Sequence, residues 1–238
     1  MNWLLVGALT GLLYQPAPVS SGVHELTMSM RGGGTMLYAI SVPRGYDPQR
    51  PVPLVVVLHS GGERIRYYGS SFMKFLALPA LDSLHPIMIA PDCPGRDWTD
   101  PVAEEAVMAL VRQTLDAYPI DARRILVMGY SMGGRGTWFM ASRHADVFTA
   151  AIPMAASTGN DPLDTLGTMP TYVIHSRADE VVPFGPAEQT ARQLIAMGRP
   201  VRFQPLDQFT HFEMYRYIDA LRLAGRWVAD RWNRSTEK

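Results

Sequence analysis

A five-residue segment constrains the fold of this chain more than any other feature. Residues 129–133 read Gly-Tyr-Ser-Met-Gly and lie between the apolar run 125–128 and a helical pattern that begins near Met132. A G-x-S-x-G sequence between a strand and a helix predicts a nucleophile elbow, a tight turn that holds the serine in strained backbone geometry and exposes its hydroxyl. Glycines flank the serine because a Cβ there would clash with the neighbouring strand or helix. The alternative is that the two glycines only permit close helix–strand packing.

Strand-like and helix-like segments alternate along the rest of the chain. We expect strands at 23–30, 35–42, 54–58, 87–90, 125–128, 148–154, 171–175 and 201–206, and helices at about 71–81, 100–118, from 132 onward, 186–197 and 215–232. The alternation predicts an α/β fold with a mostly parallel sheet covered on both faces. The first two strands predict an antiparallel edge hairpin. Ligands bind such sheets beyond the carboxyl ends of the strands, where Ser131 lies.

The composition indicates one globular domain with no strong electrostatic preference. The chain has 238 residues, with 22 Lys and Arg against 22 Asp and Glu, so its formal net charge is zero. This balance gives no electrostatic case for binding nucleic acid or an acidic membrane, and a small-molecule substrate of low charge fits better. Cys93 is the one cysteine, which excludes an intrachain disulfide and a cysteine metal cluster. We expect no metal and no cofactor.

The N-terminal segment has two possible interpretations. Residues 4–13 resemble the apolar region of a signal peptide, and 17–21 have the composition of a cleavage site, yet no Lys or Arg precedes Arg31. The apolar stretch is too short to span a bilayer. We therefore assign 1–22 to an N-terminal extension or a signal-like segment and 23–238 to the α/β domain. The sequence is compatible with a cytoplasmic location and with a secreted or periplasmic one. It is also compatible with a monomer and with a dimer.

Chain order selects the base that would serve Ser131. A serine hydroxyl needs a histidine within hydrogen-bond reach, and in this architecture the order is nucleophile, acid, histidine. Three of the six histidines precede the elbow. We expect His144 to decorate the end of the elbow helix and His175 to bond within the core. His211, in the loop between the last strand and the last helix, is therefore the predicted base.

The same order selects the acid. It should follow the strand at 171–175, and Asp179 lies four residues beyond that strand. Glu180 is adjacent and is the alternative carboxylate. Asp207 is the other competitor, but it lies too near His211 in sequence to come from a separate strand end.

Two backbone donors are needed for the oxyanion of a tetrahedral intermediate. They should come from the residue after the serine, Met132, and from the loop after the third strand. That loop reads His-Ser-Gly-Gly-Glu over 59–63, and either Gly61 or Gly62 would supply the second N–H. The alternative is a plain turn after a strand.

These segments together resemble α/β-hydrolase serine esterases of the dienelactone-hydrolase-like, feruloyl-esterase-like and polyhydroxybutyrate-depolymerase-like groups, which include members labelled predicted peptidases. The resemblance covers about residues 23–232 and rests on 43–48, 58–63, 89–94, 129–138 and 175–183. It implies the α/β-hydrolase fold and implies that Asp179 is the acid of a catalytic triad. Ser60 and Thr210 replace glycines that are usual in the family, which leaves the donor geometry and the loop path open. Dienelactone hydrolases use a cysteine at the elbow, whereas this chain has Ser131 there.

This resemblance, together with Ser131, Asp179 and His211, implies ester hydrolysis through an acyl-enzyme. Only residues 155–170 separate two strands where a cap domain is usually inserted, so we expect no large cap and an open site suited to short-chain or aryl-acyl esters. Candidate pocket residues are Trp98, Tyr67 and Tyr68, with plain surface or core positions as the alternative. Arg135 and Arg177 are candidates to meet a carboxylate on the substrate, with solvated arginines as the alternative. A serine peptidase and a non-catalytic binding protein of the same fold are the alternative functions.

Overall fold

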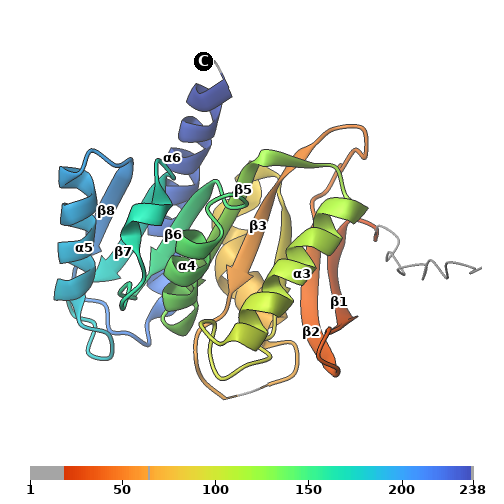
Figure 1. Cartoon of the computed structure of the whole chain (residues 1–238), viewed down its shortest axis with the longest axis horizontal. Helices are drawn as coiled ribbons and strands as arrows, with labels where there is room; N and C mark the ends of the chain where they lie inside the picture. The colour runs from red at the N-terminus through yellow and green to blue at the C-terminus, as the bar shows by residue number, and fades with distance from the viewer. Residues whose placement is uncertain (1–18, 64, 237–238) are drawn as a thin grey trace, which may run out of the picture.

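The structure is a computed structural model that describes residues 19–63 and 65–236. The described residues form one eight-stranded sheet in the order β1-β2-β4-β3-β5-β6-β7-β8 (Figure 1). The strands are β1 (Gly22–Ser29), β2 (Thr35–Val42), β3 (Val52–Leu58), β4 (Ile87–Pro91), β5 (Ile120–Tyr130), β6 (Ala150–Met154), β7 (Thr171–Ser176) and β8 (Val201–Leu206). β2 is antiparallel to both of its neighbours, and every other pair is parallel.

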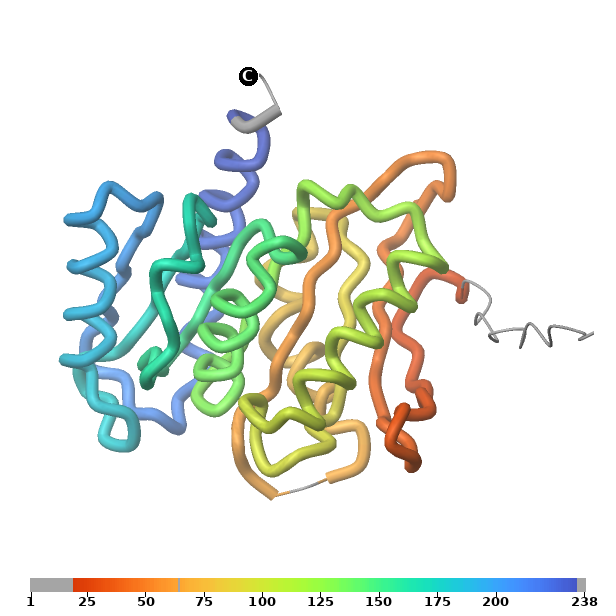
Figure 2. Tube along the Cα trace, in the orientation of Figure 1, coloured from red at the N-terminus to blue at the C-terminus, as the bar shows by residue number. Residues whose placement is uncertain are grey.

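Helices cover both faces of the sheet. The helical segments are α1 (Tyr68–Phe72), η1 (Met73–Ala77), α2 (Leu78–Leu81), η2 (Asp82–Leu84), α3 (Pro101–Ala117), α4 (Met132–Arg143), η3 (Leu163–Leu166), α5 (Phe184–Ala196), η4 (Met214–Tyr217) and α6 (Ile218–Thr236). In Figure 1, α3 and α4 lie in front of the sheet, and α6 and the short helices at 68–84 lie behind it. The trace in Figure 2 shows that the loops after β3, β5 and β7 lie along the lower edge of the sheet.

The apolar core is split by the sheet into two clusters. Val56 and Val127 pack on the side of α3 and α4, whereas Val57 and Met128 pack on the side of α6. Successive residues of a strand point to opposite faces, so a central strand with helices on both sides must be apolar at every position. This requirement explains the continuous apolar run at 54–58.

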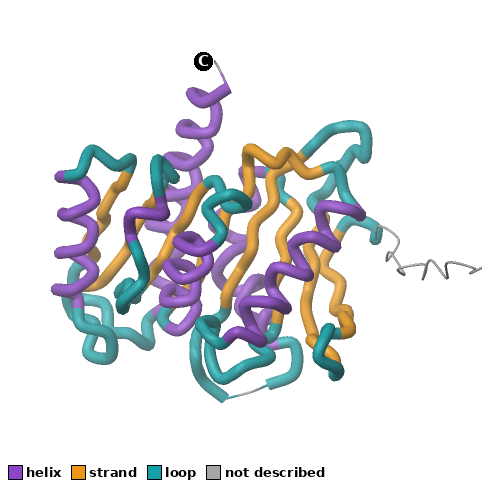
Figure 3. The backbone as a smooth tube through the Cα atoms, in the orientation of Figure 1, coloured by secondary structure: helices purple, strands orange, loops and turns teal. Residues whose placement is uncertain are grey.

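The predicted α/β-hydrolase fold with an antiparallel N-terminal edge is confirmed. The strands 35–42 and 201–206 match their predicted limits, and Asp100 caps α3 by accepting a hydrogen bond from the Val102 N–H. The helix expected at about 71–81 is present, but it begins earlier, at Tyr68, and winds as a π-helix over Met73–Ala77. Figure 3 shows the segment between β6 and β7 as a loop with a single helical turn, so the described residues contain no large cap.

Two expectations concern the chain as a whole. Residues 1–18 lie outside the described part, so the assignment of 1–22 to an extension or a signal-like segment stays a prediction, as does the domain limit at residue 23. Within the described residues, no helix combines the length and the apolar character needed to cross a membrane.

The elbow turn is packed without space for side chains at its glycines. A Cβ added to Gly133 would lie 1.9 Å from the carbonyl oxygen of Leu58, and one added to Gly129 would lie 2.4 Å from the carbonyl oxygen of Gly133. Both contacts are with backbone atoms, which no side-chain rotation can relieve. The glycines therefore allow α4 to begin directly against β3 and β5.

We predict that Gly133→Ala lowers the free energy of unfolding by at least about 3 kcal/mol, because overpacking against backbone forces the elbow apart. Gly32→Ala is the matched control, since a Cβ there would meet nothing within 4 Å, and we expect a change within about 0.5 kcal/mol. Urea unfolding of the two variants and the wild type measures both values. Equal stability of Gly133→Ala and Gly32→Ala would contradict the close approach.

Candidate active site

Ser131 lies at the sharp turn between β5 and α4. Its backbone has φ 54° and ψ −115°, a positive φ that non-glycine residues rarely adopt. The Ser131 N–H donates to the carbonyl of Met154 on the adjacent strand at 3.0 Å. The strained conformation is held by this hydrogen bond and by the close packing of the flanking glycines. The side chain is partly exposed at the carboxyl edge of the sheet.

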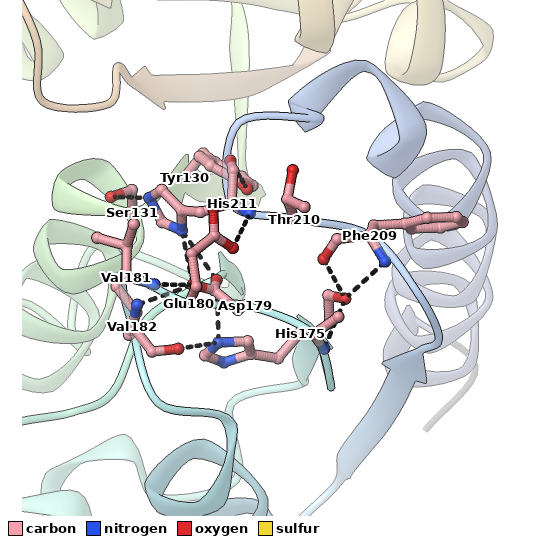
Figure 4. Close-up of polar contacts among 12 residues, drawn as sticks. Tyr130, Ser131, His175, Asp179, Glu180, Val181, Val182, Phe209, Thr210 and His211 are labelled. Carbon is pink, nitrogen blue, oxygen red and sulfur yellow. Dashed lines mark hydrogen bonds and ion pairs between the residues drawn. The ribbon is translucent and has the colours of Figure 1, made fainter.

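Three side chains from three strand ends form a continuous hydrogen-bonded array. Ser131 Oγ lies 2.8 Å from Nε2 of His211, and Nδ1 of His211 lies 2.8 Å and 3.0 Å from the two carboxylate oxygens of Asp179 (Figure 4). His211 and Asp179 are buried. The structure thus brings together the three residues that chain order selected.

The array sets the tautomer of the imidazole. A carboxylate can only accept, so Nδ1 of His211 carries a proton that it donates to Asp179. Nε2 is then the acceptor and faces the hydroxyl of Ser131. This arrangement can remove the serine proton while the buried carboxylate stabilises the imidazolium that forms.

Asp179 is bonded from several directions besides the imidazole. The backbone N–H groups of Val181 and Val182 donate to Oδ1 at 3.0 Å and 2.7 Å, and His175 Nε2 lies 3.3 Å from Oδ2. Burial alone would raise the pKa of Asp179, but the hydrogen bonds from His175, His211 and the Val182 N–H outweigh it and hold the pKa well below its usual range. The carboxyl is therefore ionised when it faces the imidazole.

The main chain of His211 is also held. Its N–H donates to Glu180 Oε2 at 3.0 Å, and its carbonyl accepts from the Tyr130 hydroxyl at 2.7 Å. Glu180 thus contacts the backbone of His211, while the neighbouring Asp179 contacts the ring. From the sequence, Glu180 is predicted only as an alternative acid, and neither contact with the His211 main chain is predicted. No local sequence pattern marks these contacts, because they join residues 31 and 81 positions apart.

A cavity of about 470 Å³ opens beside the elbow, between Met132 and the loop at 59–63. Gly61 lies against the elbow, since a Cβ added to it would be 3.7 Å from Cβ of Met132. Gly62 has φ 144° and faces the Tyr68 hydroxyl. Met132, Gly61 and Gly62 all line the cavity, and their role as oxyanion donors stays a prediction.

Two of the predicted pocket residues lie elsewhere. Trp98 is fully buried, donates from Nε1 to the His59 carbonyl at 2.9 Å and packs edge-on against the His59 ring, so the prediction that it lines the pocket is wrong. Tyr67 precedes α1 and lies under the Arg66 guanidinium, whereas its neighbour Tyr68 lines the cavity. Tyr68, and not Tyr67, is the aromatic residue of the pocket.

The two predicted arginines are engaged with acidic partners. Arg135 forms a two-pronged ion pair with Asp161 in the loop after β6. Arg177 pairs with Asp207 at 3.3 Å. The expectation that Arg135 meets a substrate carboxylate gains no support, because its guanidinium is already bound to Asp161. This ion pair holds the short loop that lies where a cap domain is usually inserted.

Residues that depart from the family pattern have defined surroundings. Ser60 Oγ is hydrogen-bonded to the Tyr68 hydroxyl at 2.8 Å, and both line the cavity. The N–H of Thr210 donates to Glu213 at 2.9 Å, which closes the turn that carries the predicted base. Cys93 is half-buried and lines the cavity. Within 19–63 and 65–236, no three His, Cys, Asp or Glu side chains are grouped in a way that could hold a metal ion.

Comparisons with known proteins establish the family of this chain. The model of the alpha/beta hydrolase family matches residues 55–237. The chain belongs to the alpha/beta hydrolase family. It is 28% identical to feruloyl esterase C of Emericella nidulans over 76% of this chain and 68% of that protein. It is 33% identical to cutinase 1 of Thermobifida cellulosilytica over 80% of this chain and 69% of that protein.

A solved structure extends the likeness to the backbone of this α/β hydrolase. The crystal structure of a thermostable esterase superposes with a TM-score of 0.77 and 26% identity, over 87% of this chain and 62% of that one. The chain spans 62% to 64% of the length of three further fungal relatives named as probable feruloyl esterases C. The expected esterase group of the family is confirmed.

We predict that Asp179→Asn lowers the free energy of unfolding of this α/β hydrolase at neutral pH by about 1 to 3 kcal/mol, because the groups that bond the carboxylate lose their charged partner. The pKa of Asp179 is lower in the folded than in the unfolded protein. Its stabilisation is therefore complete above the unfolded value of about 3.9 and is lost as the pH falls below it.

Urea unfolding of both proteins between about pH 7 and pH 3 measures this difference. The gap between the two stabilities should narrow as the pH falls from about 4 to about 3, and it should close only below the folded pKa of Asp179. A gap that stays constant with pH would show that the charge of Asp179 does not contribute.

Proposed function

We propose that this α/β hydrolase cleaves carboxylic esters by acyl transfer to Ser131. The observation that carries the proposal is the unbroken array from Ser131 Oγ through His211 to Asp179, which begins at a strained elbow and lies next to a cavity. The family and the esterase likeness support the reaction type.

The first half-reaction forms the acyl-enzyme. His211 Nε2 takes the proton of the Ser131 hydroxyl as its oxygen attacks the ester carbonyl. Asp179 keeps the proton on Nδ1 and stabilises the imidazolium. His211 then gives the proton to the leaving alcohol as the tetrahedral intermediate collapses.

Backbone N–H groups hold the negative oxygen of that intermediate. Met132 begins α4, so its N–H is one of the unpaired donors at a helix N-terminus. Gly61 lies against Met132 and is the favoured second donor, with Gly62 as the alternative. Water then attacks the acyl-enzyme by the same route, which releases the acid and restores the hydroxyl.

Short-chain or aryl-acyl esters are the proposed substrates. The cavity of about 470 Å³ is large enough for a small aryl or alkyl group, and no large cap covers it in the described residues. The relatives named as feruloyl esterase and cutinase are consistent with such groups. A peptidase that uses the same three residues is the second candidate, and a non-catalytic binding protein is the third.

We predict that Ser131→Ala lowers the rate of ester hydrolysis on the order of 10⁶-fold, because no other group replaces the nucleophile. A panel of nitrophenyl esters of increasing acyl length, an aryl-acyl ester and peptide substrates, measured on both proteins, tests the reaction and its range. We expect activity on the short and aryl esters and little on the peptides.

The same panel separates the alternatives. Full ester activity in Ser131→Ala would contradict the mechanism. Preferential cleavage of the peptides would favour the peptidase. A wild type that hydrolyses no ester and no peptide would favour a binding protein.

A further inference from the structure

The catalytic geometry depends on the position of the His211 main chain as well as on its ring. Hydrogen bonds from the ring fix its rotation only once its Cα is in place. The loop that carries it is not regular, since Gln208 has φ 67° and Thr210 occupies the position where glycine is usual. Other groups must therefore place this loop against the elbow.

Two side chains from the other triad segments bind the His211 peptide groups. Glu180, next in sequence to Asp179, accepts from the His211 N–H, and Tyr130, next to Ser131, donates to the His211 carbonyl (Figure 4). Asp179 and Ser131 thus contact the imidazole ring of His211. Their sequence neighbours Glu180 and Tyr130 contact its main chain.

Each of these contacts has favourable chemistry. Glu180 is an exposed carboxylate, and a charged acceptor makes a stronger hydrogen bond to an N–H than a neutral one. Tyr130 is buried, and its burial raises the pKa of its hydroxyl, which keeps it protonated as a donor. Its ring packs against His211 at 5.3 Å and edge-on against Tyr217 at 5.0 Å. Glu180 can therefore be truncated without opening a cavity, and Tyr130 can lose its hydroxyl without losing its packing.

We propose that Glu180 is a positioning residue for His211 through the His211 N–H, with the Tyr130 hydroxyl as its counterpart at the His211 carbonyl. Neither group touches the reacting atoms. They hold Nε2 at 2.8 Å from Ser131 Oγ, and this distance decides how fast the proton moves. The inference rests on the proposed function and adds two residues to it.

The test compares Glu180→Ala with Glu180→Gln. The amide oxygen of glutamine can still accept from the His211 N–H, whereas alanine cannot. We expect Glu180→Ala to lower kcat by about 10- to 100-fold, in line with the effect of small displacements on aligned reactants, with KM and the urea midpoint close to wild type. Glu180→Gln should recover most of kcat. Glu188→Ala, which removes an ion pair with Arg192 on α5, is the control and should match the wild type.

Tyr130→Phe gives an independent second arm. It should also lower kcat with little change in KM, because the ring stays packed while the His211 carbonyl loses its donor. Wild-type kcat in Glu180→Ala would overturn the proposal, as would a change confined to KM. A glutamine variant as slow as the alanine variant would also overturn it, since charge and not the hydrogen bond would then be responsible.

A spectroscopic measurement separates failure of this proposal from failure of the proposed function. The proton between His211 Nδ1 and Asp179 gives a far-downfield proton resonance when the pair is well aligned. We expect Glu180→Ala to broaden or shift this resonance and Glu180→Gln to retain it, whether or not the protein cleaves esters. An unchanged resonance in Glu180→Ala would overturn the positioning role even if Ser131→Ala had abolished ester hydrolysis.

Discussion

The close approach of backbone to backbone at the elbow is the constraint on which the rest of the site depends. With no Cβ at Gly133, the first turn of α4 meets the carbonyl of Leu58 at the end of β3. This contact forces Ser131 into a positive φ and brings Met132 beside Gly61 in the loop after β3. The strained backbone of Ser131 and the closeness of Met132 to Gly61 are thus two consequences of one packing requirement.

The proposed base and the proposed acid reach the elbow from separate strand ends. Asp179 follows β7 and His211 follows β8, so a parallel sheet delivers both to the edge where Ser131 lies. Parallel order brings the loops near one another, but the hydrogen bonds between them set the distances. Asp179 illustrates this, because the hydrogen bonds it accepts from the Val182 N–H and from the imidazoles of His175 and His211 outweigh the cost of burying its charge.

The sequence predicts the residues of the array better than the residues of the pocket. The elbow pattern is local and chain order restricts the acid and the base to single loops, which predicts Ser131 and His211. Chain order leaves Glu180 beside Asp179 as an alternative acid, and the family resemblance favours Asp179. The direction of an aromatic side chain depends on packing between distant segments. Trp98 is therefore buried against His59, and of the two candidate tyrosines only Tyr68 lines the cavity. The fold follows from the strand pattern, whereas the π-helical turn at Met73–Ala77 has no pattern that marks it.

Acyl transfer to Ser131 would form a covalent intermediate, and trapping that intermediate is the sharpest test of the proposed mechanism. The protein would be mixed with a nitrophenyl ester, quenched in acid within the first turnovers and analysed by mass spectrometry of the intact chain and its peptides. We predict a mass increase equal to the acyl group, located on the peptide that contains Ser131. An adduct on Cys93, or ester cleavage without any adduct under conditions where an acyl-enzyme would accumulate, would contradict the account.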